Sequence, residues 1–160
     1  MVQCKSSTAS TGTHCASSPK CSRACRSSPA ITAKTSHLLG PDDALLDNPR
    51  NYRDPRTAGM LEEAFSRMPR EEIFSHTGVQ FMKLNSLYQL LAMRDSPLLQ
   101  SANTLLLMAD LFNFYFTGNK VCEFSNATTT QFYDPRKNAW STELLTGLGL
   151  PTHFLPEIVQ

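Results

Sequence analysis

The residues with the most visible chemistry form one short run, Tyr52-Arg53-Asp54-Pro55-Arg56. An aromatic ring can cover the apolar face of a sugar, and a carboxylate flanked by guanidinium groups can bridge sugar hydroxyls. The run therefore indicates a polyol-binding site. A structural alternative stays open, because Asp54 before Pro55 is also a typical helix start, and the two arginines could simply be solvated.

Little other chemistry is visible along the chain. The seven glycines are scattered, so no glycine-rich phosphate-binding loop is predicted. No arrangement of Ser, His, Cys and Asp carries a local catalytic signature. His76 and His153 stand alone in the sequence and are predicted to be surface or capping residues. No catalytic residue and no metal ligand is therefore predicted in residues 37–160.

The first 36 residues differ in composition from the rest. They hold all but one of the five cysteines, no Asp or Glu, and few large aliphatic side chains. Such a segment cannot bury enough surface to order itself, so residues 1–36 are predicted to be disordered. A transit peptide, a basic nucleic-acid arm and a zinc site remain open, although each lacks part of its usual pattern. The zinc ligands would be His14, Cys15, Cys21 and Cys25.

Residues 37–160 are predicted to form a helix-rich body. Apolar residues recur at helical spacing in short segments, each flanked by residue types that start or end helices. A turn at 40–43 is predicted to join two short strands, and residues 105–108 to form a strand or buried turn. Three helices are predicted over residues 55–68, 97–102 and 142–148. Three more are predicted from their end residues: one starts at Pro69 and ends at Gly78, one is capped by Asn85, and one is capped by Asp110 and ends at Gly118.

The longest apolar run, residues 105–116, is interrupted by Asp110 and Asn113. It is shorter than the roughly 20 residues that cross a bilayer, so no membrane partner is predicted. Several predicted helix faces, including this run, have no obvious partner in the chain. We therefore expect exposed apolar surface.

A polar segment inside an aromatic frame lies at residues 118–140. Six consecutive small residues, 125–130, favour caps and turns over helix interiors. Phe124, Phe132 and Trp140 surround them and favour burial. The pattern predicts either an ordered turn or an ordinary surface loop with aromatic anchors.

Five segments of the body resemble one enzyme family. They are residues 52–57, 70–74, 77–81, 85–90 and 123–131, the last reading Glu-Phe-Ser-Asn-Ala-Thr-Thr-Thr-Gln. In the same order they resemble segments of the FGGY carbohydrate kinases and, within that family, of the rhamnulokinases. The resemblance covers about residues 37–160. It implies an α/β fold, a helix-rich part of the actin/hexokinase-like (ribonuclease H-like) N-terminal domain, preceded by the disordered arm.

The resemblance also implies an activity. The family transfers the γ-phosphate of ATP, with Mg²⁺, to a sugar hydroxyl, here L-rhamnulose, in the cytoplasm and without a nucleic-acid partner. Two alternatives remain open: a truncated, non-catalytic remnant, or a kinase of the same family that acts on another ketose or polyol. The residues implied to face or support the sugar are Tyr52, Asp54, Arg56, Gln80 and Asn85. Asn126 and the following threonines are implied to hold the architecture.

The family's catalytic Asp belongs to a later part of the enzyme, so no catalytic base is predicted here. The family's Asp-x-Gly strand pair and Asp-Thr-Trp-Gly-Val-Asp-Phe segment, expected before Leu38, have no match in this sequence. The resemblance begins abruptly near His37, which supports the hypothesis that residues 1–36 are an out-of-frame or misassigned start. We therefore expect no turnover from this polypeptide alone.

Overall fold

The structure, a computed structural model, describes residues 35–51 and 53–160. The predictions for residues 1–34, including the zinc ligands, and for Tyr52 lie outside these ranges. Of the N-terminal segment predicted to be disordered, Thr35 and Ser36 are described, and Ser36 is the first residue of strand β1.

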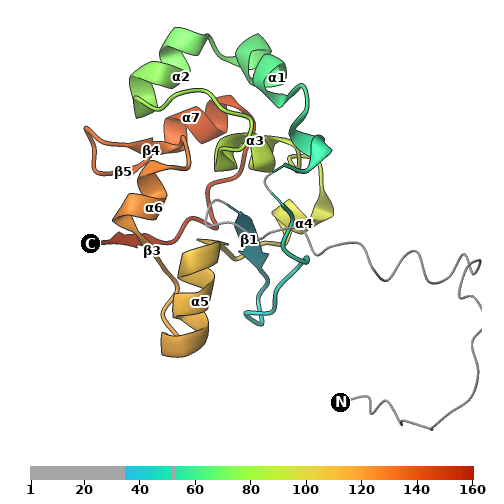
Figure 1. Cartoon of the computed structure of the whole chain (residues 1–160), viewed down its shortest axis with the longest axis vertical. Helices are drawn as coiled ribbons and strands as arrows, with labels where there is room; N and C mark the ends of the chain where they lie inside the picture. Colours follow the sequence, from blue (N-terminus) through green and yellow to red (C-terminus); the bar gives the residue numbers. More distant parts are fainter. Residues whose placement is uncertain (1–34, 52) are drawn as a thin grey trace, which may run out of the picture.

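Short helices and short strands make up the described chain, and most of the helices in its first half follow one another without a strand between them (Figure 1). The helices are α1 (Met60–Arg67), α2 (Arg70–Thr77), α3 (Ser86–Leu91), α4 (Pro97–Gln100), α5 (Met108–Thr117), α6 (Phe124–Thr128) and α7 (Thr142–Gly147), with a 3-10 turn η1 (Pro55–Thr57). The strands are β1 (Ser36–Leu39), β2 (Thr104–Leu107), β3 (Val121–Glu123), β4 (Tyr133–Asp134), β5 (Ala139–Trp140) and β6 (Glu157–Val159). The chain is therefore helix-rich, as expected.

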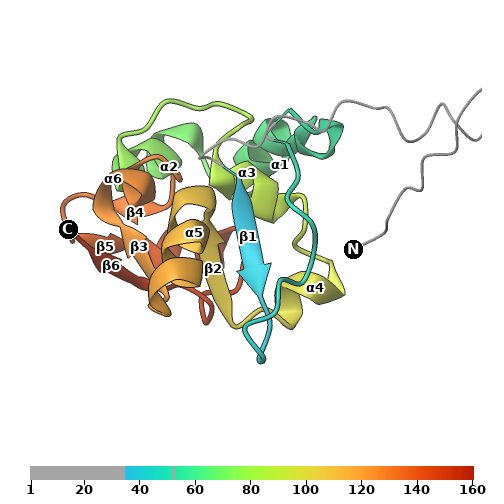
Figure 2. The same cartoon turned by 60° about the horizontal axis from the view of Figure 1, so that its bottom comes forward.

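The strands pair two by two in the described chain. β1 pairs antiparallel with β2, β3 parallel with β6, and β4 antiparallel with β5. Figure 2 shows β1 and β2 side by side, with α5 against them. After β1 the chain turns back, and Leu39 bridges Leu45 while the Leu46 amide donates to the Leu38 carbonyl at 2.9 Å. The predicted turn between two short extended segments is thus confirmed.

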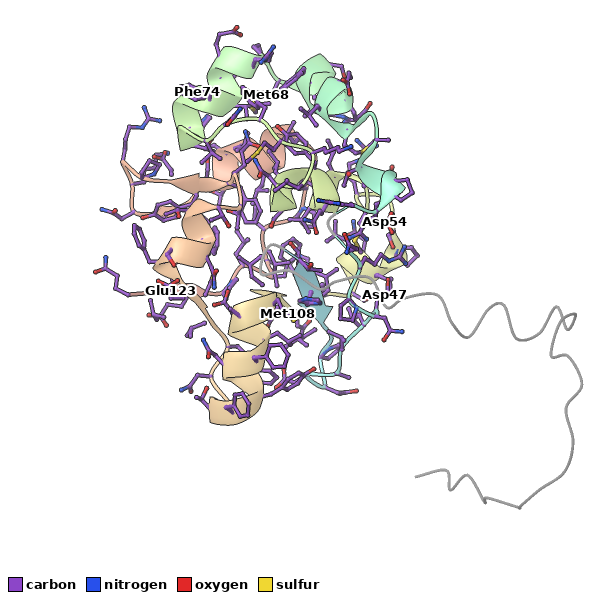
Figure 3. The ribbon with its side chains drawn as sticks, in the orientation of Figure 1. Asp47, Asp54, Met68, Phe74, Met108 and Glu123 are labelled. Atoms are coloured by element: carbon purple, nitrogen blue, oxygen red, sulfur yellow. The ribbon has the colours of Figure 1, made fainter. Side chains whose placement is uncertain are left out.

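The main core lies between α1, α2, α3 and α7 (Figure 3). Ile73 of α2, Leu87 of α3 and Leu144 of α7 are fully buried there. Phe132 is also buried and lies 5.2 Å from the Trp140 ring, centroid to centroid. The Trp140 Nε1 donates to the carbonyl of Pro156 at 2.7 Å. The segment after α7 is thereby tied to the β4–β5 hairpin.

Two helix predictions are wrong, one in its extent and one in its start. Residues 55–68 do not form one helix, because extended Ala58 and left-handed Gly59 (φ 79°) separate η1 from α1. Asp110 does not cap α5, which begins two residues earlier at Met108. Asp110 instead lies buried in the first turn. Its Oδ1 accepts hydrogen bonds from the Glu123 amide at 3.1 Å and from Asn126 Nδ2 at 3.2 Å.

The polar segment 125–130 is ordered. Residues Phe124–Thr128 form α6, whose first turn is capped by the Glu123 carboxylate through the amides of Ser125 (2.9 Å) and Asn126 (3.2 Å). The Thr130 hydroxyl donates to the Ala127 carbonyl at 2.7 Å. The segment is therefore ordered, as one alternative predicted, but residues 125–128 lie in a short helix and not in the turn that their composition favoured.

The apolar run 105–116 is buried in its first half and exposed in its second. Leu105, Leu106 and Leu107 lie in β2 with at most 3% exposure, whereas Phe112, Tyr115 and Phe116 on α5 are 54%, 56% and 84% exposed. The expectation of exposed apolar surface is confirmed for α5. Among the described residues, no helix is long and apolar enough to span a membrane.

Candidate functional site

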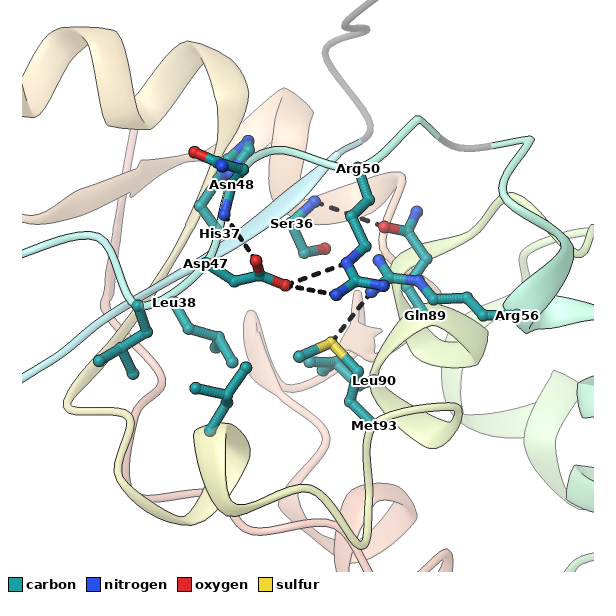
Figure 4. A pocket seen from close by; sticks show the side chains of 12 residues that line it. Ser36, His37, Leu38, Asp47, Asn48, Arg50, Arg56, Gln89, Leu90 and Met93 are labelled. Carbon is teal, nitrogen blue, oxygen red and sulfur yellow. Dashed lines mark hydrogen bonds and ion pairs between the residues drawn. The ribbon is translucent and has the colours of Figure 1, made fainter. Parts of the chain in front are cut away.

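A pocket opens between β1, the loop 46–50, η1 and α3 (Figure 4). Its cavity is small, about 20 Å³, close to the space that one water molecule needs. One side is apolar, made by Leu38, Leu46, Leu90, Met93 and Leu98. The other is polar, made by Ser36, His37, Asp47, Asn48, Arg50, Arg56 and Gln89. The lining thus offers hydrogen-bonding groups opposite an apolar surface, around a space about the size of one water molecule.

Arg56 is placed in this pocket by η1. Asp54 Oδ1 accepts a hydrogen bond from the Arg56 amide at 2.9 Å and so starts the 3-10 turn. The Arg56 Nη1 lies 3.3 Å from the Met93 sulfur, and its buried Nε has no partner among the described residues. Burial, and then the charge of Arg50, lower the pKa of Arg56. The guanidinium stays protonated and keeps donors for a ligand.

The loop 47–50 is folded around the Asp47 carboxylate. Arg50 donates to Asp47 Oδ2 from Nε at 3.0 Å and from Nη2 at 2.7 Å, and the Asn48 amide donates to Oδ1 at 2.8 Å. The hydrogen bond from Arg50 is the main reason that the pKa of Asp47 lies below its ordinary value. The pocket therefore holds one paired and one unpaired guanidinium.

Strand β1 contributes His37 and Ser36. Burial lowers the pKa of His37 to about 4, so its imidazole is neutral at pH 7. The His37 Nε2 and the Ser36 hydroxyl are both buried without a partner among the described residues. These groups add unpaired polar atoms to the side of the pocket where Arg56 lies.

Asn85 and Gln80 are brought together elsewhere. Asn85 is fully buried, and its Nδ2 donates to the Gln80 carbonyl at 3.0 Å and to Gln131 Oε1 at 2.9 Å. Gln131, whose backbone is left-handed (φ 68°), donates in turn to the Val79 carbonyl at 3.2 Å. Neither Asn85 nor Gln80 lines the pocket around Arg56. Their role toward a sugar stays a prediction.

Asp54 lies beside the pocket, at a shallow depression that it shares with Arg50 and Arg53. Its structural alternative, the start of a turn, is observed in the cap of η1. Of the five predicted site residues, Arg56 lines the pocket, Asp54 supports it, Gln80 and Asn85 lie apart, and Tyr52 lies outside the described residues.

The sequence reasoning did not single out Asp47, Arg50 and Gln89 as site residues. Asp47 and Arg50 form an ion pair three residues apart around Pro49, a spacing that is readable in the sequence. Gln89 gives no such signal. It enters the site because α3 packs beside β1, where the Ser36 amide approaches Gln89 Oε1 at 3.5 Å.

The two predicted lone histidines both contact polar groups. His76 Nδ1 lies 3.2 Å from the Ser141 hydroxyl, and His153 Nε2 lies 2.9 Å from the Ala102 carbonyl. Across residues 35–51 and 53–160, no three His, Cys, Asp or Glu side chains are grouped to hold a metal ion. None of these residues is assigned to Mg²⁺ or to ATP.

Comparison with known proteins gives one consistent result. Residues 28–160 match the N-terminal domain of the FGGY family of carbohydrate kinases. The chain is 41% identical over 123 residues to a rhamnulokinase of Oceanobacillus iheyensis, covering 76% of this chain and 26% of that protein. It is 42% identical over 130 residues to a rhamnulokinase of Pectobacterium atrosepticum, with the same two coverages, 76% and 26%. The chain thus spans about a quarter of the length of these relatives.

Solved structures agree on the fold. A ligand-bound xylulose kinase from Lactobacillus acidophilus superposes with a TM-score of 0.71 at 25% identity, over 79% of this chain and 26% of that one. A xylulose kinase from Rhodospirillum rubrum gives a TM-score of 0.69 at 20% identity, over 78% of this chain and 26% of that one. The described helices and small sheets correspond to part of the domain in these kinases.

Proposed function

The chain belongs to the FGGY family of carbohydrate kinases, and we propose that it is part of a cytoplasmic kinase that phosphorylates L-rhamnulose. Its fold is part of the actin/hexokinase-like N-terminal domain. The observation that carries the choice of sugar is the 41–42% identity to two rhamnulokinases over 76% of the chain. The family implies the use of ATP, and we propose Mg²⁺ as its partner.

The mixed polar and apolar lining at the pocket mouth, and not its volume, supports a deoxysugar. L-rhamnulose is a 6-deoxyketose, with hydroxyls along its chain and one terminal methyl group. We propose that Arg56 and Gln89 meet hydroxyl oxygens, while the methyl group packs against Leu90 and Met93 on the apolar side. A sugar with a 6-hydroxyl group would place that hydroxyl unpaired against the apolar side, which costs about 1–3 kcal/mol and sets the expected discrimination.

ATP, when bound, supplies the phosphoryl group that is transferred to the sugar hydroxyl. The residues of this chain are proposed to bind and orient the sugar only. Tyr52, Asp54, Gln80 and Asn85 remain proposed sugar-side residues, with Asp54 acting through the turn that presents Arg56.

Calorimetric titration of the chain with sugars tests this proposal. L-rhamnulose is expected to bind about tenfold or more tightly than L-fructose, its 6-hydroxyl counterpart, because the additional hydroxyl would be unpaired on the apolar side. D-xylulose and glycerol serve as further comparisons, since similar structures include kinases of xylulose and glycerol. Arg56→Ala should abolish binding, while Arg67→Ala on the surface of α1 should not.

A coupled ADP-release assay separates the alternatives. We expect no turnover from this polypeptide alone, and measurable ADP release would overturn that expectation. Equal binding of all the sugars would favour a family member for another ketose or polyol. No sugar binding by a folded chain would favour the non-catalytic remnant.

A further inference from the structure

The outer face of helix α5 is aromatic and open. On its inner side the helix packs Leu111 against strands β1 and β2. On its outer side Phe112, Tyr115 and Phe116 are 54%, 56% and 84% exposed. Figure 1 shows α5 at the end of the described chain opposite α1 and α2. Three aromatic side chains of one helix therefore lie uncovered on the described part of the chain.

This outer face carries no charge. Asp110 is the one charged residue of α5, and it is only 1% exposed. Just beyond the helix end, Lys120 is paired with Asp43 at 2.6 Å. A helix that lies on a lipid surface usually has Lys or Arg on its polar face, and α5 has neither. Two copies of an uncharged face, in contrast, meet without repulsion between like charges.

The spacing of the exposed residues makes the face complementary to itself. Ala109 is exposed and lies seven residues, or about two turns, before Phe116. When two α5 helices pack antiparallel about a two-fold axis between Phe112 and Asn113, the Phe116 ring of each copy lies opposite the small Ala109 side chain of the other. The most exposed ring then meets the smallest side chain of the face, and the two helix dipoles run in opposite directions, which is favourable.

We propose that the outer face of α5 binds a second copy of this chain and forms a two-fold dimer. The three rings expose roughly 400 Å² in each copy, so the dimer buries roughly 800 Å² through them alone. Stable interfaces bury about 1,200–2,000 Å² in total, so this dimer is weak and forms only at high concentration. The interface goes beyond the proposed kinase activity and needs no bound sugar.

Sedimentation equilibrium of the full 160-residue chain, from about 10 µM to about 1 mM, tests the dimer. The average mass should rise with concentration from that of one chain toward that of two. Phe116→Ser should weaken association about tenfold or more, because buried aromatic side chains carry much of the energy of an interface. The matched control Phe74→Ser removes a 51% exposed ring from α2, at the other end of the chain, and should leave association unchanged.

A pair of charge variants tests the two-fold geometry. The Asn113 side chains of the two copies lie next to the axis, so Asn113→Glu should repel itself and stay a monomer, and Asn113→Lys should do the same. An equimolar mixture of the two variants should associate again, because the charges that meet are then opposite. Thr146→Glu, at an exposed position of α7, adds the same charge elsewhere and should dimerise like the unchanged chain. Circular dichroism checks that each variant is folded.

Several outcomes would overturn the dimer. A folded chain that stays a monomer at every concentration does so, as do equal losses in Phe74→Ser and Phe116→Ser. Assembly beyond two copies, or a mixture of the charge variants that stays monomeric, contradicts the two-fold packing. Binding of a monomer to phosphatidylcholine vesicles that is lost in Phe116→Ser identifies a lipid surface as the occupant of this face instead.

Discussion

Asn85→Ala should destabilise the chain without acting through the pocket. The substitution removes the donor to the part-buried Gln80 carbonyl at 3.0 Å and to the buried Gln131 Oε1 at 2.9 Å. Leaving a buried acceptor unpaired costs about 1–3 kcal/mol, and the part-buried carbonyl costs less. Loss of the unpaired Asn85 Oδ1 offsets a little of this. We expect the free energy of unfolding to fall by about 2–4 kcal/mol.

Urea unfolding followed by circular dichroism measures this change. The control Asn119→Ala, at an exposed position, should change stability by less than about 0.5 kcal/mol. A double-mutant cycle with Gln131→Ala should give a coupling energy of about 1 kcal/mol or more, because the two amides bond directly. A loss below about 1 kcal/mol, or no coupling, would refute the structural reasoning. Loss of sugar binding at unchanged stability would instead favour the sugar-side role predicted for Asn85.

Three further predictions concern pH, backbone and surface. The pKa of His37 is lowered from 6.5 to about 4, so the unfolded chain takes up a proton at a higher pH than the folded chain does. The free energy of unfolding should therefore fall as the pH drops from 6.5 toward 4, by at most about 3 kcal/mol. His37→Gln should remove that part of the pH dependence in urea unfolding. Gly118→Ala should lower the free energy of unfolding by about 1 kcal/mol in the same assay, because Gly118 ends α5 at φ 77°, where an alanine is strained although there is open space around it. Gly40→Ala is the comparison, because Gly40 has an ordinary φ beside Leu46, and its loss of stability is expected to be smaller. The chain should bind an apolar dye through α5, and replacing Phe112 and Phe116 by Ser should lower the dye signal while changing stability by about 0.5 kcal/mol or less; an unchanged signal would contradict this.

The helices predicted correctly from the sequence are those whose first and last residues are of types that start or end a helix. Helix α2 was predicted because Pro69 starts it and left-handed Gly78 ends it, and the structure agrees. The 55–68 helix was wrong because the apolar spacing from Met60 onward does not reveal that Ala58 is extended and Gly59 is left-handed. Asp110 has the residue type of a cap, but a buried acceptor role needs partners that arrive from β3 and α6.

One residue that lines the pocket also stands out in the sequence. Arg56 stood out because it lies in a dense polar run, and it does line the pocket. Gln89, Met93 and Ser36 come from segments that meet only when α3 packs beside β1, so no local pattern marks them. Asn85 was assigned to the sugar side by the family resemblance alone, and no local pattern reveals that its amide donates to Gln131 Oε1.

The chain carries its own optical probe. Trp140 is the one tryptophan in the sequence, and it is half-buried between the Phe132 ring and the carbonyl of Pro156. Its indole therefore reports whether the segment after α7 is docked on the β4–β5 hairpin. A red shift and quenching of tryptophan emission that precede the loss of helical signal would mark detachment of this segment as a separate step. Fluorescence then distinguishes local opening near the C-terminal strand from unfolding of the core.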